Sequence, residues 1–267
     1  MDTARYLSQG AIKAEGALST EALALAQAAY DWSLANPGPG AGQLPNRDGG
    51  EFYQDLANPT SFAAYDELVR HDDITDLVRT VFQGNSAWFM YEQVFKKHGG
   101  TTRRTPWHQD TPYLPVNGQD LLVIWISFDE VAEDAALEFI AGSHMGEFYD
   151  GSRFDPDDDT APLYNDPSYP RLPDIESHRS DYEVISWPSK PGDAVLFHPS
   201  TLHGGAPTQA NTSRRTLSLR FFGEDAVVAE RPGAKVANPN KNSHPLNQVR
   251  GLKPGTPFRH PEFPRIF

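Results

Sequence analysis

The stretch WFMYEQVF at residues 88–95 decides the fold, because it opens a series of short strands after a partly helical beginning. Most of its residues are aromatic or β-branched, which is typical of strands. The chain also contains 21 glycines, 23 prolines and 11% aromatic residues, so many turns between short strands predict a β-rich sandwich or barrel. Similar segments, bounded by Gly, Pro, Asn or Asp, occur at residues 121–128, 137–140, 182–186, 194–197 and 216–222.

Two helices are predicted before these strands. Ser19 or Thr20 can cap a helix over residues 21–34, with a buried face made of Leu23, Ala26, Tyr30 and Leu34. Asp72 or Asp73 can cap a second helix, which we expect to pack on a sheet. Its apolar residues recur at intervals of three and four positions, and they are Ile74, Leu77, Val78, Val81 and Phe82.

The chain of 267 residues shows neither an internal repeat nor a clear linker, so we expect one domain over residues 1–267. Its parts would be a helical region at about 18–83, a β-core at about 85–225 and a C-terminal surface segment at 226–267. Residues 145–181 are rich in Pro and Asp without periodicity. A long connection of this kind is often functional, and we expect it to cover a site. Phe258, Phe263 and Phe267 would anchor the C-terminal segment.

Composition excludes several classes of function. The chain has no cysteine, so disulfides, thiolate zinc sites and cysteine nucleophiles are impossible. Its formal charge of −13 opposes non-specific binding to nucleic acid or to an anionic membrane surface. No apolar run approaches the roughly 20 residues of a membrane span, and residues 1–10 lack the apolar core of a secretory signal. We therefore expect a cytoplasmic protein that binds neither nucleic acid nor membrane.

The stretch TPWHQD at residues 105–110 contains a candidate metal pair. His108 and Asp110 are two residues apart, and side chains at i and i+2 of an extended backbone point to the same side. One imidazole and one carboxylate would then face a single point. A His-x-Asp pattern alone also fits a solvated turn, so a third ligand is needed from elsewhere in the chain.

Two histidines compete for the third position. The segment PGDAVLFHPSTLHGG at residues 191–205 enters a buried strand through a Gly-Asp turn and contains both His198 and His203. His203 precedes two glycines, whose missing side chains would let a ligand approach the backbone, whereas His198 precedes Pro199 at a strand end. The residues favour His203 modestly. Two histidines and one carboxylate would form the facial triad of non-heme Fe(II) oxygenases.

A strand with a polar face follows the second histidine. The sequence SRRTLSLRFF at residues 213–222 alternates with period two. One face carries Arg214, Thr216, Ser218 and Arg220, whereas Arg215 shares the opposite face with apolar residues. An arginine can bind a carboxylate through two parallel hydrogen bonds. This face would therefore suit a dicarboxylate ligand, although a solvent-facing strand would show the same pattern.

Together, these segments resemble the phytanoyl-CoA dioxygenase family of Fe(II)/2-oxoglutarate oxygenases. The likeness covers roughly residues 85 to 225, and its pieces are residues 105–110, LVIWIS at 122–127, AGSH at 141–144 and the run from Gly192-Asp193 through His203-Gly204-Gly205 to Arg214-Arg215. The chain departs from the family at residues 133–136, at Ala141 and at Gly205. The resemblance implies a mainly β fold with flanking α-helices, a double-stranded β-helix or cupin-like jelly roll.

The resemblance also implies a set of site residues. It places the metal on His108, Asp110 and His203, and the distal carboxylate of 2-oxoglutarate on Arg214, eleven residues beyond the last ligand. It further suggests cosubstrate contacts from Thr105, Gln93 and Trp125. Fe(II), 2-oxoglutarate and O₂ would be the cofactors.

The implied function is a dioxygenase that hydroxylates a small molecule and releases succinate and CO₂. Related halogenases replace the metal carboxylate with a small residue, and Asp110 is present here, which favours hydroxylation or another C–H oxidation. The alternative is a jelly-roll metal protein without oxygenase activity, such as a cupin-like isomerase or a 2-oxoglutarate sensor. Trp107, Tyr113, Arg103 and Arg104 flank the predicted site and could contact an anionic or aromatic substrate.

Overall fold

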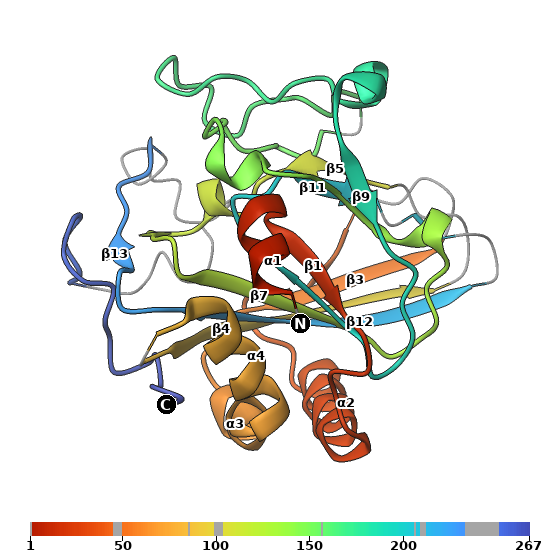
Figure 1. Ribbon diagram of the computed structural model, residues 1–267, viewed down its shortest axis with the longest axis vertical. Helices are drawn as coiled ribbons and strands as arrows, with labels where there is room; N and C mark the ends of the chain where they lie inside the picture. The colour runs from red at the N-terminus through yellow and green to blue at the C-terminus, as the bar shows by residue number, and fades with distance from the viewer. Residues whose placement is uncertain are drawn as a thin grey trace.

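Two antiparallel β-sheets form the body of the protein (Figure 1). The computed structural model describes residues 2–44, 50–84, 86–98, 104–155, 157–205, 207–208, 212–232 and 251–267. In these ranges the large sheet has the order β1 (Ala11–Ala14), β10 (Ala194–Phe197), β7 (Leu121–Ser127), β12 (Ser213–Phe222), β4 (Trp88–His98), β3 (Glu51–Leu56) and β2 (Gly42–Gln43). The small sheet has the order β5 (Thr105–His108), β11 (His203–Gly205), β8 (Leu137–Ile140) and β9 (Val184–Ser186). The fold is the cupin-like jelly roll that we expected.

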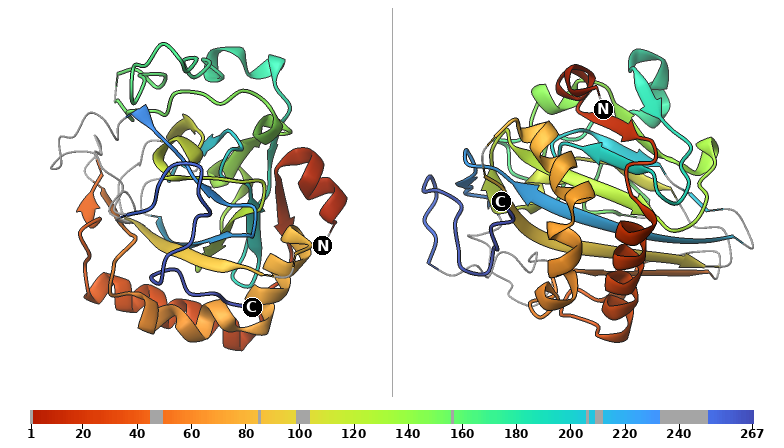
Figure 2. Two further views of the ribbon diagram at one scale, coloured as in Figure 1. Left: turned by 90° about the vertical axis from the view of Figure 1, so that its left-hand side faces the viewer. Right: turned by 60° about the horizontal axis from the view of Figure 1, so that its bottom comes forward.

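Helices cover the outer face of the large sheet, as the right-hand view of Figure 2 shows. They are α2 (Thr20–Ala35), α3 (Phe62–Arg70) and α4 (Asp72–Phe82), while the short α1 (Thr3–Gln9) precedes β1. The predicted cap of α2 is confirmed, because the Ser19 side chain accepts from the Ala22 N–H. The apolar stripe of α4 is also buried as predicted. No helix in the described ranges is long and apolar enough to cross a bilayer.

Three expectations for the first third of the chain need correction. The cap of α4 is His71 rather than Asp72 or Asp73, because the His71 ring accepts from the Asp73 N–H while the Asp73 carboxylate accepts from the Ser19 N–H. The buried face of α2 consists mainly of small residues, and Leu23 and Leu34 only partly pack against the core. The region around 18–83 is not purely helical, since β2 and β3 extend the large sheet beyond β4.

Strand alternation separates two cores. On β12, Leu217, Leu219 and Phe221 face the helices, so Arg214 and Arg220 lie on the inner face toward the small sheet. Arg215 points outward, where its Nη2 is 2.8 Å from Asp129 Oδ1. The predicted phase of this strand is therefore confirmed. Between the sheets, Val123 and Trp125 of β7 pack with Phe139 and Phe197.

Residues 141–183 connect β8 to β9 and cross the small sheet on the side away from α2–α4 (Figure 1). This connection contains the 3₁₀ helices η3 (Ser143–Met145) and η4 (Glu176–Asp181). Leu172 and Ile175 pack on Trp107, Ile140 and Leu202, so the connection has an apolar base on the small sheet.

The C-terminal residues 251–267 lie at the end of the two sheets that faces the viewer in the left-hand view of Figure 2. Phe258 and Phe263 are buried against Phe222 of β12, and the Arg79 guanidinium lies over the Phe267 ring. The predicted aromatic anchors are thus confirmed. A short pair, β6 (Val116–Asn117) with β13 (Val227–Val228), lies beside this segment. Residues 233–250 lie outside the described ranges.

Candidate metal and cosubstrate site

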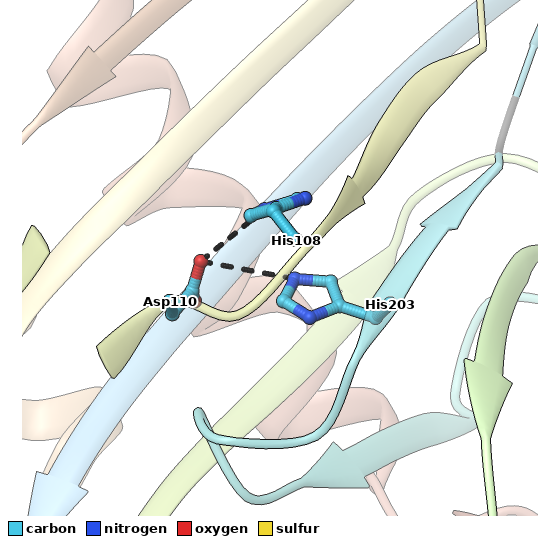
Figure 3. A group of neighbouring side chains, drawn as sticks. All are labelled: His108, Asp110 and His203. Atoms are coloured by element: carbon cyan, nitrogen blue, oxygen red, sulfur yellow. Dashed lines mark ion pairs between the residues drawn. The ribbon is translucent and has the colours of Figure 1, made fainter. Parts of the chain in front are cut away.

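His108, Asp110 and His203 converge at one point between the sheets (Figure 3). His108 ends β5, His203 begins β11, and the two residues are direct partners in the antiparallel pair. Asp110 follows β5, and its backbone N–H donates to the Pro199 carbonyl in the loop before β11. One ligand atom from each residue lies within 4.8 Å of the others. Asp110 Oδ1 is 3.5 Å from His108 Nε2 and 3.7 Å from His203 Nε2.

Both imidazoles present a lone pair to this point. His108 Nδ1 donates to the Pro106 carbonyl at 2.8 Å, and His203 Nδ1 donates to the Thr201 carbonyl at 2.9 Å. A carbonyl can only accept, so in each neutral ring the Nε2 atom carries the lone pair. Burial, reinforced by His108, lowers the pKa of His203 to about 4. A neutral imidazole oriented by a backbone carbonyl is a good ligand for a divalent transition metal.

The third group, Asp110, is ionised. Burial raises the pKa of its carboxyl, but the Arg220 guanidinium and the neighbouring histidines outweigh burial and hold this pKa far below its usual range. Arg220 Nη2 is 2.9 Å from Asp110 Oδ2. The remaining oxygen, Oδ1, faces the two Nε2 atoms. Two imidazoles and one carboxylate form a donor set that fits Fe(II).

The structure brings His203, and not His198, to this point. His198 Nδ1 accepts from the Ser200 N–H at 3.1 Å, and its ring faces His144 at 5.8 Å between centroids. The glycines after His203 also have a role in the packing of the strands. Gly204 allows β5 to lie close to β11, because a Cβ there would lie 2.8 Å from the Thr105 carbonyl oxygen. Gly205 has a φ of +79°, which glycine adopts most easily.

Cations line the inner face of the large sheet at some distance from the triad. Arg214 is buried and donates from Nη1 to the Ala135 carbonyl at 2.6 Å, and burial lowers its pKa to about 10. Lys97 of β4 is its direct cross-strand partner and is also buried. Burial, together with the charge on Arg214, lowers the pKa of Lys97. A bound anion of charge −2 would favour the charged form of both groups.

The other expected cosubstrate contacts occupy different positions. Gln93 of β4, Ser218 of β12 and Trp125 of β7 form one cross-strand row on the inner face. Thr105 is half-buried at the start of β5, opposite Gly205. The pairing of β5 with β11 is irregular there, so strand alternation does not fix the direction of the Thr105 side chain.

Among the described residues expected to contact substrate, Tyr113 has its ring beside His108 of the triad. Its ring centroid is 6.3 Å from that of His108, and its hydroxyl donates to the Ser152 carbonyl at 2.5 Å. Phe154, from the connection between β8 and β9, lies still nearer, with its ring 5.1 Å from His108 and stacked on Tyr113. Sequence reasoning missed Phe154, because nothing in an aperiodic segment distinguishes one aromatic residue from another.

Trp107 and Arg104 instead join the small sheet to that connection. Trp107 is the strand neighbour of His108, so its side chain takes the opposite face, and its Nε1 donates to Glu176 at 2.7 Å. Arg104 Nη2 is 2.6 Å from the same Glu176 carboxylate. Arg103 lies outside the described residues.

Lys97 and Arg220 were also missed as individual site residues. The alternation of residues 213–222 places Arg220 on the same face as Arg214, which is a usable signal. Lys97 lay beyond the predicted end of its strand at residue 95, and β4 in fact continues to His98.

Solved structures with this fold include two proteins of nogalamycin biosynthesis. The non-heme α-ketoglutarate-dependent epimerase SnoN has a TM-score of 0.70 and 19% identity, and the match covers 99% of this chain and 94% of that chain. The corresponding carbocyclase, SnoK, has a TM-score of 0.71 and 19% identity, with coverage of 99% and 95%. SnoN has also been solved in complex with Fe³⁺, α-ketoglutarate and nogalamycin RO. At this level of identity the likeness concerns the fold.

Curated relatives agree with one another in their description. The peroxisomal phytanoyl-CoA dioxygenase of Homo sapiens is 24% identical over 182 residues, which are 66% of this chain and 52% of the human protein. The probable phytanoyl-CoA dioxygenase of Caenorhabditis elegans is 22% identical over 167 residues, with 60% and 51% covered. The chain therefore spans about half the length of the curated relatives that it matches.

The family model described as phytanoyl-CoA dioxygenase (PhyH) matches residues 6–216. This range contains the three converging residues of the triad and the buried Arg214, and it makes up most of the chain. The chain belongs to the phytanoyl-CoA dioxygenase family.

Proposed function

We propose that this chain is an Fe(II)- and 2-oxoglutarate-dependent dioxygenase, acting as a single domain, that hydroxylates a C–H bond of a small molecule and releases succinate and CO₂. One observation carries the proposal: two imidazoles and one carboxylate converge between the sheets, on the side faced by Arg214. Iron and 2-oxoglutarate are the cofactors of this family, and the donor set fits iron.

In this proposal, His108, Asp110 and His203 hold the Fe(II) ion. A two-His, one-carboxylate set leaves coordination positions open for a bidentate cosubstrate and O₂. When bound, iron and 2-oxoglutarate supply the oxidation of the substrate C–H bond by O₂. The backbone carbonyls of Pro106 and Thr201 keep both imidazoles in the tautomer that binds metal.

Arg214 would bind the distal carboxylate of 2-oxoglutarate, and Lys97 beside it would add a second positive charge. A guanidinium and an ammonium in a buried, low-dielectric setting attract a dianion more strongly than exposed groups do. Gln93 and Trp125 would line the cosubstrate in this proposal, which their position on the same inner face as Arg214 supports. Thr105 remains a proposed contact.

The substrate would bind under the connection between β8 and β9, for which we propose the role of a lid over residues 145–181. Phe154 and Tyr113 form an aromatic wall beside His108, which suits a substrate with apolar or aromatic surface. Direct substrate contacts by Trp107 and Arg104 remain predictions, since both side chains are engaged by Glu176. A lid would exclude water during the oxidation.

A second outcome of the same chemistry has specific support. Proteins that share this fold are described as an epimerase and a carbocyclase, both dependent on α-ketoglutarate. Both outcomes would begin with removal of hydrogen from a C–H bond and would leave the product without an added oxygen. Ring closure would remove two hydrogens from the substrate, whereas inversion of a stereocentre would return a hydrogen to the opposite face and would consume two electrons from an external reductant such as ascorbate. Asp110 occupies the carboxylate position of the triad, which favours either outcome over halogenation.

The experiment that tests the proposal measures succinate. The purified chain is incubated in air with Fe(II), ascorbate and 2-oxoglutarate, with and without metabolite extracts, and Asp110→Ala is the control. We expect slow succinate formation that the extract stimulates and that the variant lacks. A product heavier by one oxygen indicates hydroxylation, whereas a loss of two hydrogens or an unchanged mass indicates the second outcome. Metal binding without succinate under any condition would instead identify a sensor or an isomerase.

A further inference from the structure

Arg220 makes a direct contact with the triad that the proposed function does not yet use. Its side chain is 6% exposed and comes from the inner face of β12 in the large sheet, whereas Asp110 follows β5 in the small sheet. Arg220 Nη2 lies 2.9 Å from Asp110 Oδ2, and the guanidinium also lies over the Tyr91 ring, 4.8 Å from its centroid. The contact therefore spans the two sheets and ends on one particular oxygen of the carboxylate.

We propose that Arg220 is the positioning residue for the metal carboxylate. The inference rests on the proposed function, because it assigns a role toward the metal that His108, Asp110 and His203 would hold. By occupying Oδ2, Arg220 fixes the rotation of the carboxylate so that Oδ1 faces both Nε2 atoms. Asp110 then offers one oxygen to the metal, and the coordination positions needed by the cosubstrate stay open.

The energetics of this contact favour a positioning role for Arg220 over a role in packing alone. Arg220 Nε and Nη1 are buried without a hydrogen-bond partner among the described residues. A buried cation with unsatisfied donors stabilises a fold poorly, and apolar side chains of similar volume often serve better in its place. Packing alone therefore does not account for an arginine at this position, whereas its contact with Asp110 does.

The test compares metal affinity in three variants of the full chain. Arg220→Met removes the charge and keeps much of the volume, whereas Arg220→Lys keeps a charge without the planar fork. Arg215→Met is the matched control, because Arg215 is on the same strand and pairs with Asp129 on the opposite face. Anaerobic titration calorimetry with Mn(II) gives the affinity, and the visible absorption of bound Co(II) reports on the ligand set.

We expect Arg220→Met to weaken Mn(II) binding about 10- to 100-fold, as loss of an outer partner of a ligand generally does, and to change the Co(II) spectrum. Arg220→Lys should recover part of the affinity, and Arg215→Met should stay close to the parent chain. If Arg220→Met does not fold, as judged by circular dichroism, Arg220→Gln takes its place with the same expectation.

Two results would count against different claims. A folded Arg220→Met or Arg220→Gln variant that binds Mn(II) as tightly as the parent, with the same Co(II) spectrum, overturns the positioning role, even if its melting temperature falls. A parent chain that binds neither metal overturns the proposed function itself. The two failures are therefore distinguishable in one set of titrations.

Discussion

Both histidines of the triad are oriented by the same local contact. Each Nδ1 atom donates to the backbone carbonyl two residues earlier in the chain, from Pro106 for His108 and from Thr201 for His203. Because the partner is so close in sequence, the local backbone conformation itself selects the tautomer. The two Nε2 atoms are then brought together by the pairing of β5 with β11.

At Arg214, we predict a large loss of 2-oxoglutarate affinity on substitution. Arg214→Ala removes a buried charge-assisted partner of a carboxylate, a loss on the order of 2–5 kcal/mol. Arg215→Ala should change affinity little, because Arg215 points outward to Asp129. Calorimetry of 2-oxoglutarate with the Mn(II)-loaded chain measures both variants. Equal losses in the two would show that the inner face of β12 does not bind the cosubstrate.

Single residues differed in how well the sequence predicted them. The His-x-Asp pair and Arg214 stand in patterns with a defined spacing, and the structure places them as those patterns indicate. The choice between His198 and His203 could not be made securely from the residues, because both are followed by turn residues. Only the pairing of distant strands shows that His203 lies opposite His108.

At the scale of elements, hydrogen bonds between side chains and backbone groups hold the connection between β8 and β9 to the site. Gln109 Nε2 donates to the Glu147 carbonyl at 3.0 Å, its Oε1 accepts from the Tyr149 N–H, and the Tyr164 hydroxyl donates to the Pro112 carbonyl at 2.6 Å. All three contacts lie within a few residues of Asp110. A ligand bound at the triad would therefore affect this connection directly.

We predict that residues 145–181 become more protected from hydrogen exchange when Mn(II), 2-oxoglutarate and the substrate found by screening are added together. The protection of α2, on the far side of the large sheet, should stay unchanged and serves as the control. Shortening the connection should reduce substrate oxidation more than succinate formation. Unchanged protection, together with unchanged turnover after shortening, would refute the lid.

The junction between β4 and α3 should make stability depend on pH. Glu92 is buried and accepts from the Asn58 N–H and the Ser61 hydroxyl, and burial raises its pKa from 4.5 to about 7. The folded state therefore holds a proton that the unfolded state releases above about pH 4.5. The stability gained from that proton is complete below pH 4.5 and is lost as the pH rises to about 7.

The measurement for this junction is the free energy of unfolding in urea, for the parent chain and for Glu92→Gln, between pH 5 and pH 8. We expect the parent to lose up to about 3 kcal/mol relative to the variant over this range. Above pH 7 the difference should be constant. Parallel curves from pH 5 to pH 8 would mean that Glu92 has an ordinary pKa.

Elements were predicted best where they are strongly patterned or rich in apolar residues. Helix α4 and strand β12 follow from periodicity, because many residues contribute to each pattern. Strands β7, β8 and β10 follow from their aromatic and β-branched residues and from the turn residues around them. Strands β5 and β11 have four and three residues and contain no such apolar run. Strand β3 was missed because its aromatic residues lie next to charged ones, and pairing with β4 stabilises it.

At the scale of the whole molecule, the net charge of −13 contrasts with the cations on the inner face of the large sheet. Lys97, Arg214 and Arg220 all lie there, and Asp110 is the carboxylate bound to one of them. In the proposed function, this interior would hold a divalent metal through Asp110 and a dianion through Arg214 and Lys97. The acidic surface would then lie apart from the site for the anionic cosubstrate.

The central claim is that His108, Asp110 and His203 form the iron site, and an anaerobic Fe(II) titration of the parent, His203→Ala and His198→Ala tests it most directly. His198 is a well-matched control, because it is as buried as His203 and its pKa is also lowered to about 4, by burial and by His144. We predict that the parent and His198→Ala bind one Fe(II) tightly and that His203→Ala does not. Tight binding by His203→Ala, or its loss in His198→Ala, would contradict the account.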